Sequence, residues 1–586
     1  MMFTPRFLII LITIPVLILL EIQHLHLLTD PSSISSWIPD VLRPSSWQRP
    51  RVQIAQGTLL GSTIAENLNV PVEAFRGIPY AVPPVGERRF RRAEAVPVPA
   101  RVNGDGDAEE VVIDAGRLGK RCPGKQLIPL KGDTGSDEDC LTVNVFRPKG
   151  VTDKDKVPVA VYIHGGAYNR GSALMHNTAS MVGWIGALGF LPSSTTAKEG
   201  VLNLGLHDQL LLLQWVQDKI ASFGGDPSQV TLFGVSAGAH SIAHHIMNTD
   251  LHHSLFHRAI IESGAATSRA VHPIDSALHE AQFRQFVEAS HCDGLPDSEI
   301  FPCLRTQPID LISNASSTVF DRYNPSVRWA FQPVIDNELI KRRPIDAWHS
   351  GDWNKMPILT GFNTNEGTYY VPVNMSTSQQ FRNFFHTLLP AYTEQDLNTV
   401  DALYPDPETS ALSPYTETRP IAVGSQYKRV EAAYGHYAYA CPVRQTAHFA
   451  SLDTGSNENP VFLYRWALNK TVQGGANHAD QLPYEAYDAD VRGLSEAQEE
   501  VAGQLHAYFT SFIVTGDPNA IPGRFSGRPR WERYVGEEGK GKVMVFGEGN
   551  DERAGGTGRG VAAKVVDDEW SRRECEFWWT KAGLSD

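Results

Sequence analysis

The chain has 586 residues, and its 52 Lys and Arg residues against 66 Asp and Glu residues give a net charge of −14 at pH 7. An acidic surface repels phosphate, so this charge excludes nucleic-acid binding through a broad basic surface. Hydrophobic residues make up 42% of the chain, which excludes intrinsic disorder as its overall state.

The N-terminal segment has the pattern of an export signal. Arg6 precedes a fourteen-residue apolar run, Phe7 to Leu20. A transmembrane helix needs about 20 such residues, whereas a signal-peptide core has roughly 7–15. We assign residues 1–28 to a signal peptide, with an uncleaved signal anchor as the alternative because no clear small-x-small cleavage site follows. Residues 29–50 are rich in Pro and Ser and are typical of a linker, so a folded domain is expected over 51–582. The chain is therefore predicted to be secreted, with a membrane contact only if the anchor is retained.

Six cysteines, an even number, suit an oxidising compartment, and parity alone allows fifteen ways to pair them. Two close pairs, Cys122 with Cys140 and Cys292 with Cys303, could each close a local loop, leaving Cys441 and Cys575 for a long-range bridge. Buried free thiols are the alternative. Asn-x-Ser/Thr sequons at Asn314, Asn374 and Asn469 are glycosylation candidates, although chance alone supplies two or three.

Short apolar runs alternate with helical patterns along the domain. The runs Leu141–Phe146, Val157–Ile163 and Val230–Ser236 are predicted strands, and a helical pattern lies between the last two. The segments HRAIIESG, MPILTGFN and VFLYRWAL repeat the pattern of a strand that ends in polar or Gly-rich residues. This alternation predicts an α/β fold with a mainly parallel sheet whose ligands lie at the carboxyl ends of its strands. Residues 536–560 are predicted to form a flexible surface insertion.

A nucleophile motif follows one of these strands. Gly234 to Gly238 fit G-x-S-x-G with Ser236 at the centre, placed between a predicted strand and a predicted helix. A nucleophile there occupies a sharp turn with strained backbone angles, which needs flanking glycines. Gly165 and Gly166 follow the strand Val157–Ile163 directly, and with the Ala237 N–H their amides could bind a developing oxyanion.

The same chemistry needs a histidine oriented by a carboxylate, in the chain order Ser, acid, His. His478 lies in a loop beyond the predicted strand Val461–Leu468, and Glu366 lies just past the strand Met356–Thr360. These positions favour His478 as the base and Glu366 as the acid. Competing candidates sit in helical patterns or do not follow a strand so directly. They are the histidines His436, His448 and His506 and the acids Asp336 and Asp352.

Several sequence blocks together resemble the type-B carboxylesterase/cholinesterase family of α/β-hydrolases, over roughly Val52 to Trp579. The blocks are FRGIPYAVPPVGERRF, EDCLTVNVFRP, HGGAY, GGDPSQVTLFGVSAGAHS, GFNTNEGT, NHADQLPY and YFTSFIVTGDPN, in family order.

The resemblance implies an α/β-hydrolase fold and a serine ester hydrolase that acts through an acyl-enzyme on a small-molecule ester, with no metal or organic cofactor. It implies Ser236 as nucleophile, Glu366 as orienting acid and His478 as general base, with an oxyanion hole from Gly165, Gly166 and Ala237. It also implies three disulfides. They are Cys122–Cys140, Cys292–Cys303 and Cys441–Cys575.

The chain departs from the family pattern at three places. Val235 stands before the nucleophile where many members have Glu, which disfavours a cationic choline-type substrate. The Cys122–Cys140 loop is short for a lipase lid, which favours soluble or short-chain esters. Between Tyr168 and Gly189 no β-branched apolar run occurs, so one expected central strand is missing. We hypothesise that an exon or its edge near Gly183–Gly189 is absent from the gene model.

Two alternative functions remain from the sequence. One is an extracellular triacylglycerol lipase, which differs in chain-length preference and in activation at an oil–water interface. The other is a non-catalytic cholinesterase-like binding protein, although such proteins typically lose the nucleophile or the histidine. The sequence identifies neither the ester nor the oligomeric state.

Overall fold

The computed structural model describes residues 49–66, 68–99, 111–125, 133–172, 180–181, 185–250, 255–269, 271–418, 421–452, 459–470, 475–537, 540–552 and 560–584. The predicted signal peptide or anchor, residues 1–28, and the linker up to residue 48 lie outside the described residues. Across the described part of the chain, no helix combines the length and the apolar character needed to cross a membrane.

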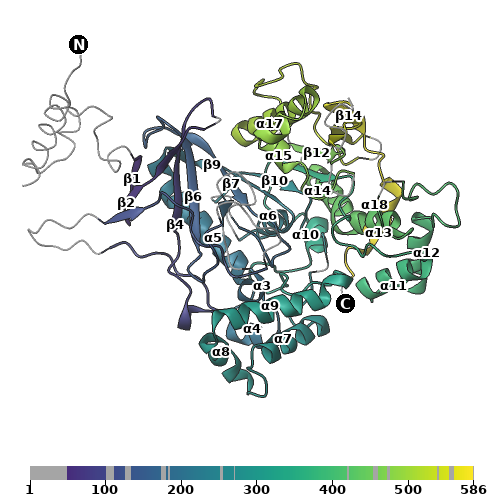
Figure 1. The fold of residues 1–586 in the computed structure, drawn as a ribbon, viewed down its shortest axis with the longest axis horizontal. Helices are drawn as coiled ribbons and strands as arrows, with labels where there is room; N and C mark the ends of the chain where they lie inside the picture. The colour runs from purple at the N-terminus through teal and green to yellow at the C-terminus, as the bar shows by residue number, and fades with distance from the viewer. Residues whose placement is uncertain are drawn as a thin grey trace, which may run out of the picture.

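An eleven-stranded sheet runs through the molecule in the order β14-β13-β12-β11-β10-β9-β7-β8-β6-β4-β3 (Figure 1). Its strands are β3 (Ser62–Ile64), β4 (Val72–Pro79), β6 (Thr142–Pro148), β7 (Val157–Ile163), β8 (Ser180–Met181), β9 (Gly225–Val235), β10 (Arg258–Glu262), β11 (Ile358–Asn363), β12 (Val461–Trp466), β13 (Lys542–Phe546) and β14 (Ala563–Asp567). Every pairing from β8 across to β13 is parallel, and the pairings at the two edges are antiparallel. The predicted mainly parallel α/β sheet is confirmed.

A small sheet and a set of helices complete the fold. The small sheet contains β1 (Arg51–Ile54), β2 (Gly57–Leu60) and β5 (Val112–Asp114). The helices are α3 (Gly186–Gly189), α4 (Ser194–Glu199), α5 (Leu204–Lys219), α6 (Ala237–Met247), α7 (Ala277–Ala289), α8 (Asp297–Thr306), α9 (Ile309–Tyr323), α10 (Pro344–Ser350), α11 (Ser378–Leu388), α12 (Glu394–Leu403), α13 (Tyr427–Gly435), α14 (Cys441–Leu452), α15 (Leu482–Glu485), α16 (Ala489–Arg492), α17 (Glu496–Thr515) and α18 (Arg572–Lys581).

Alternate side chains of the strands enter two separate cores, as the period of two in a strand requires. Tyr162 of β7 and Phe233 of β9 pack in the core that contains α17. Val161 and Leu232, their immediate neighbours, pack in the core that contains α5 and α6. Both faces of the central strands are therefore covered, which explains why these strands are almost continuously apolar.

In the described part of the chain, the sheet is incomplete between β6 and β7, where the sequence predicts a missing strand. Among the described residues, which leave out 173–179 and 182–184, only the two-residue β8 lies there, and it pairs with Tyr162 and Ile163 at the carboxyl end of β7. Below it, a cavity of about 560 Å³ is lined by both strand edges, by α5 on one face and by α17 on the other. Strand β8 bridges one end of this space, and the missing strand stays a prediction.

Sequencing the transcript across the codons for Gly183 to Gly189 is expected to reveal additional in-frame codons. A strand parallel to β7 must start at its amino end, so the missing segment must cross the sheet and return, which takes about 10–15 residues. The added run should be apolar and β-branched, because both faces of the gap are buried. A transcript identical to the present sequence would contradict this prediction.

The prediction of a surface insertion over residues 536–560 is wrong. Lys542–Phe546 form β13, which pairs with β12 on one side and β14 on the other. The four apolar residues after Lys542 are buried in the sheet. The Gly-rich sequence on both sides hid this strand, because glycine is typical of loops.

All six cysteines are paired, as Cys122–Cys140, Cys292–Cys303 and Cys441–Cys575. These are the three bridges that the family resemblance implies. Of the glycosylation candidates, Asn314 and Asn374 are exposed and Asn469 is half-buried. Glycosylation at the three positions stays a prediction.

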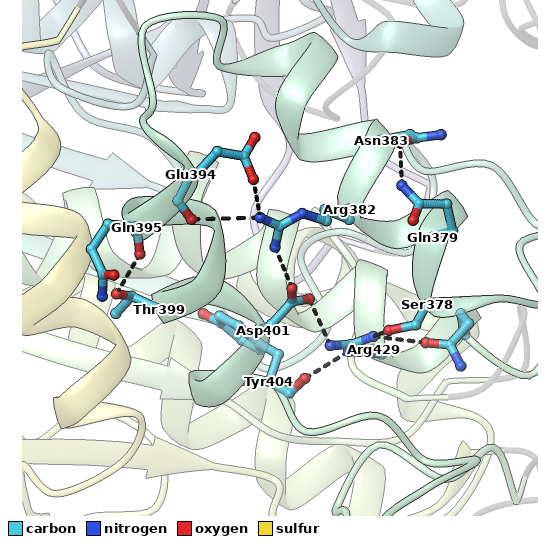
Figure 2. Close-up of polar contacts among 11 residues, drawn as sticks. Ser378, Gln379, Arg382, Asn383, Glu394, Gln395, Thr399, Asp401, Tyr404 and Arg429 are labelled. Atoms are coloured by element: carbon cyan, nitrogen blue, oxygen red, sulfur yellow. Dashed lines mark hydrogen bonds and ion pairs between the residues drawn. The ribbon is translucent and has the colours of Figure 1, made fainter.

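Helices α11, α12 and α13 are joined by a network of charged groups (Figure 2). Asp401 of α12 accepts from Arg382 at 2.6 Å and from the buried Arg429 of α13 at 3.1 Å. Arg429 also donates to the Tyr404 carbonyl at 2.6 Å. The network fixes the position of α13. Gly367, the residue after Glu366, packs directly against α13, since a side chain at Gly367 would lie 2.0 Å from the Glu431 carbonyl oxygen.

Candidate active site

Ser236 lies in a sharp turn between the end of β9 and the start of α6. Its backbone angles, φ 60° and ψ −127°, belong to a region that non-glycine residues rarely adopt, and such strain costs about 1–3 kcal/mol. A side chain at Gly238 would lie 2.0 Å from the Ile163 carbonyl oxygen, and one at Gly234 would lie 2.6 Å from it. Both glycines are therefore needed for the turn to pack against β7.

Glu366 and His478 are brought together by neighbouring parallel strands. Glu366 follows β11 and His478 follows β12, and these strands pair in parallel, so their carboxyl ends meet at one edge of the sheet. His478 Nδ1 lies 2.5 Å from Glu366 Oε2, and both side chains are buried. The other carboxylate oxygen of Glu366 accepts from the Asn363 amide at 2.6 Å, which fixes its orientation.

The second ring nitrogen of His478 is left available. Its Nε2 atom is buried and has no hydrogen-bond partner among the described residues, so the hydrogen bond to Ser236 Oγ is not formed in this structure. Rings of Tyr439 and Tyr370 pack against the imidazole, with centroids 4.6 and 5.3 Å away. Serine–histidine contacts are often long without substrate, so this geometry is compatible with proton transfer after substrate binds.

The predicted oxyanion donors lie beside Ser236. Gly165 is so close that a side chain there would approach Ser236 Cβ to 3.0 Å. Gly166 has φ +120°, and a side chain on it would meet the Arg170 carbonyl at 2.1 Å. Ala237 is the first residue of α6, so its N–H has no acceptor within the helix. The sequence reasoning missed Gly171, where a side chain would lie 2.3 Å from His164 Nδ1.

The competing residues have other contacts. His436 binds the Tyr404 hydroxyl at 2.8 Å, and His506 contacts the Glu485 carbonyl at 2.8 Å. Asp336 accepts from the Ile340 amide at 2.8 Å, and Asp352 pairs with Arg342 at 2.7 Å. The His448 ring packs against the Trp579 ring, with centroids 5.2 Å apart, in a helix–helix contact. None of these five contacts involves Ser236, Glu366 or His478.

Two buried carboxyls that the sequence analysis did not identify lie beneath the site. Glu262 ends β10, and its carbonyl accepts from the Ser236 amide at 2.9 Å. Its carboxyl accepts from the Tyr464 hydroxyl at 2.7 Å and faces Glu485. Burial raises the pKa of Glu262, and burial together with the Glu262 charge raises the pKa of Glu485 well above its ordinary value. The fold therefore favours the protonated form of this pair.

Replacing Glu485 by Gln is expected to stabilise the protein increasingly as pH rises. A carboxyl with a raised pKa in the fold stays protonated there while the unfolded chain releases its proton, so stability falls as pH rises above about 4.5 towards the folded pKa. Glutamine has no proton to lose. Thermal unfolding of both forms between pH 5 and 8 measures this, and a difference in melting temperature that shrinks with pH would contradict it.

Comparisons with known proteins agree with this architecture. A sequence model described as the carboxylesterase family matches residues 48–578. Secreted lipase 4 of Gibberella zeae is 33% identical over 544 residues, covering 89% of this chain and 91% of its own length. Lipase 1 of Geotrichum candidum is 30% identical over 532 residues, covering 82% of this chain and 90% of its own length. The crystal structure of Aspergillus niger EstA superposes with a TM-score of 0.75 at 27% identity, covering 92% of this chain and 99% of that one.

Proposed function

Since the chain belongs to the carboxylesterase family and is a carboxylic ester hydrolase, we propose that Ser236, Glu366 and His478 carry out the hydrolysis. The observation that supports this assignment is the buried 2.5 Å contact between Glu366 and His478, at the same sheet edge as the strained turn of Ser236. A carboxylate at Nδ1 leaves Nε2 to accept a proton, which is the orientation that a general base needs.

The reaction then has two balanced steps. His478 Nε2 takes the proton of Ser236 as Oγ attacks the ester carbonyl, and the amides of Gly165, Gly166 and Ala237 stabilise the oxyanion. The intermediate collapses to an acyl-enzyme as the alcohol leaves with the proton from His478. Water then loses a proton to His478, attacks the acyl group and releases the acid, and Ser236 regains its proton.

Hydrolysis of p-nitrophenyl butyrate by the purified chain tests this function. We expect equal amounts of p-nitrophenolate and butyrate to appear continuously with excess ester. A soluble, folded chain that released neither product would contradict the proposal and favour the non-catalytic binding role.

A lipase activity is the second candidate, because Secreted lipase 4 and Lipase 1 bear that name. Tributyrin assayed below and above its solubility limit separates the two candidates. A rate that rises steeply once droplets form identifies a lipase, whereas saturation below that limit identifies an esterase for soluble substrates.

We also propose that the chain is exported. The three disulfides suit an oxidising compartment, and two relatives from Gibberella zeae are named as secreted. Expression of the full chain in a secreting host, followed by N-terminal sequencing, tests this. A mature N-terminus near residue 28 in the medium is expected, and retention in the membrane fraction would favour the anchor.

A further inference from the structure

A second cavity, of about 80 Å³, lies beside the candidate active site. The loop after β10 contributes Arg269, α6 contributes His240 and His244, and Trp329 forms part of the opposite wall. Among the described residues that line it there is no aspartate or glutamate. The chain as a whole has a net charge of −14, whereas the described lining of this cavity has a guanidinium group and no acid. The charge of the cavity is therefore opposite in sign to that of the chain.

Arg269 is held in the wall without an acidic partner among the described residues. Its guanidinium carbon lies 3.8 Å from the Trp329 ring centroid, and one terminal nitrogen donates to the Tyr439 hydroxyl at 2.7 Å. Its Nε and Nη1 atoms are buried and have no hydrogen-bond partner in the described structure. Stacking on Trp329 fixes the plane of the group. The Nη2 atom that binds Tyr439 keeps a second N–H, which lies parallel to an N–H of Nε or of Nη1, so one pair of donors remains in the geometry that suits a carboxylate.

Other polar atoms of the same wall also lack partners. Ser268 Oγ, His240 Nε2 and His244 Nδ1 are buried and unpaired among the described residues. Burial lowers the pKa of His240 well below its ordinary value and that of His244 to about 4, so both rings are neutral at pH 7. A cation without an acidic partner among the described residues, together with unpaired polar atoms, is costly for a fold, and an anion in the cavity would offset that cost.

The cavity is connected to the reacting groups through single side chains. Tyr439, which binds Arg269, places its ring 4.6 Å from His478. His240 lies one helical turn after Ser236, and its amide donates to the Ser236 carbonyl at 2.9 Å. Tyr439 and His240 therefore contact the reacting residues from the side of the cavity wall.

From these contacts we propose that Arg269 binds a free carboxylate on the substrate. The preferred esters are then half-esters of dicarboxylic acids, with the carboxylate several carbons from the scissile carbonyl. This inference rests on the proposed ester hydrolysis and adds a substrate class to it. Arg269 acts as a specificity-determining residue through a charge-assisted, bidentate contact.

Two esters of matched length test the proposal. Monoethyl adipate carries the carboxylate, and ethyl hexanoate has a methyl group in its place. The kcat/KM for monoethyl adipate divided by that for ethyl hexanoate is expected to be at least about tenfold lower in Arg269→Met than in wild type, because the charge-assisted hydrogen bonds to the carboxylate are lost. Arg269→Lys keeps the positive charge but not the paired N–H donors, so its ratio should lie between those of wild type and Arg269→Met. Arg284→Met, on the exposed side of α7, should leave the ratio unchanged.

An equal ratio in wild type and Arg269→Met would overturn the proposal. If wild type hydrolysed neither ester, the proposed ester hydrolysis would fail instead, so binding is measured separately. Adipate should raise the melting temperature of wild type, and of Arg269→Lys to a smaller extent. An equal rise in Arg269→Met, or no rise in wild type, would contradict carboxylate binding at Arg269.

Discussion

Ester hydrolysis is expected to fall by about 10⁴- to 10⁶-fold when Ser236 is replaced by alanine. The substitution removes the atom that becomes acylated, whereas the Glu366–His478 contact and the oxyanion amides remain. The remaining reaction is then direct attack of water on the ester, assisted only by those groups. Initial rates with p-nitrophenyl butyrate at pH 8 measure the effect.

The control for this variant must separate lost chemistry from lost folding. Alanine has one atom fewer at a buried site, so the melting temperature should change little. Ser290→Ala removes another buried hydroxyl, at the end of α7, and should keep the wild-type rate. A Ser236→Ala protein that is folded and retains more than about a hundredth of the activity would show that another residue is the nucleophile.

Removal of the Cys441–Cys575 bridge is expected to cause the largest loss of stability. The two cysteines are 134 residues apart and buried, and the bridge fixes the C-terminal α18 on α14. In the chain-entropy model a loop of this length contributes about 5 kcal/mol, against about 3 kcal/mol for the Cys292–Cys303 loop of 11 residues. Replacing both cysteines of each pair by alanine and comparing urea unfolding measures the two contributions.

The predicted order is that the Cys441/Cys575 double variant unfolds at the lower urea concentration. A second contact supports this order. The Trp579 indole of α18 donates to the Cys441 carbonyl at 2.7 Å, and this hydrogen bond is lost when α18 detaches. Equal midpoints, or a lower midpoint for the Cys292/Cys303 variant, would contradict the assignment of the long bridge as the main covalent restraint.

Features that depend on local sequence were predictable. Strand β7 occupies the predicted residues Val157–Ile163, because a strand that lies between two helix layers needs an uninterrupted apolar run. The turn at Ser236 was predictable because its two glycines are required by contacts with the neighbouring strand. The positions of Glu366 and His478 followed from strand ends, since parallel strands bring their carboxyl ends together.

Features that depend on approach between distant segments were not predictable. Glu262 and Glu485 are 223 residues apart, and no local pattern indicates that their carboxyls meet. Arg269 lies in a loop whose sequence gives no sign that its guanidinium stacks on Trp329. Strand β13 was missed for a different reason, because its apolar run is short and lies between Gly-rich segments.

Covalent labelling of the nucleophile tests the central claim most directly. An organophosphate with a nitrophenol leaving group, such as diethyl p-nitrophenyl phosphate, phosphorylates an activated serine and releases one nitrophenolate for each site. We predict one equivalent of nitrophenolate per chain, loss of ester hydrolysis in parallel, and a single diethylphosphoryl adduct that peptide mass spectrometry locates on Ser236. An adduct on another residue, or full hydrolytic activity with Ser236 modified, would contradict the account.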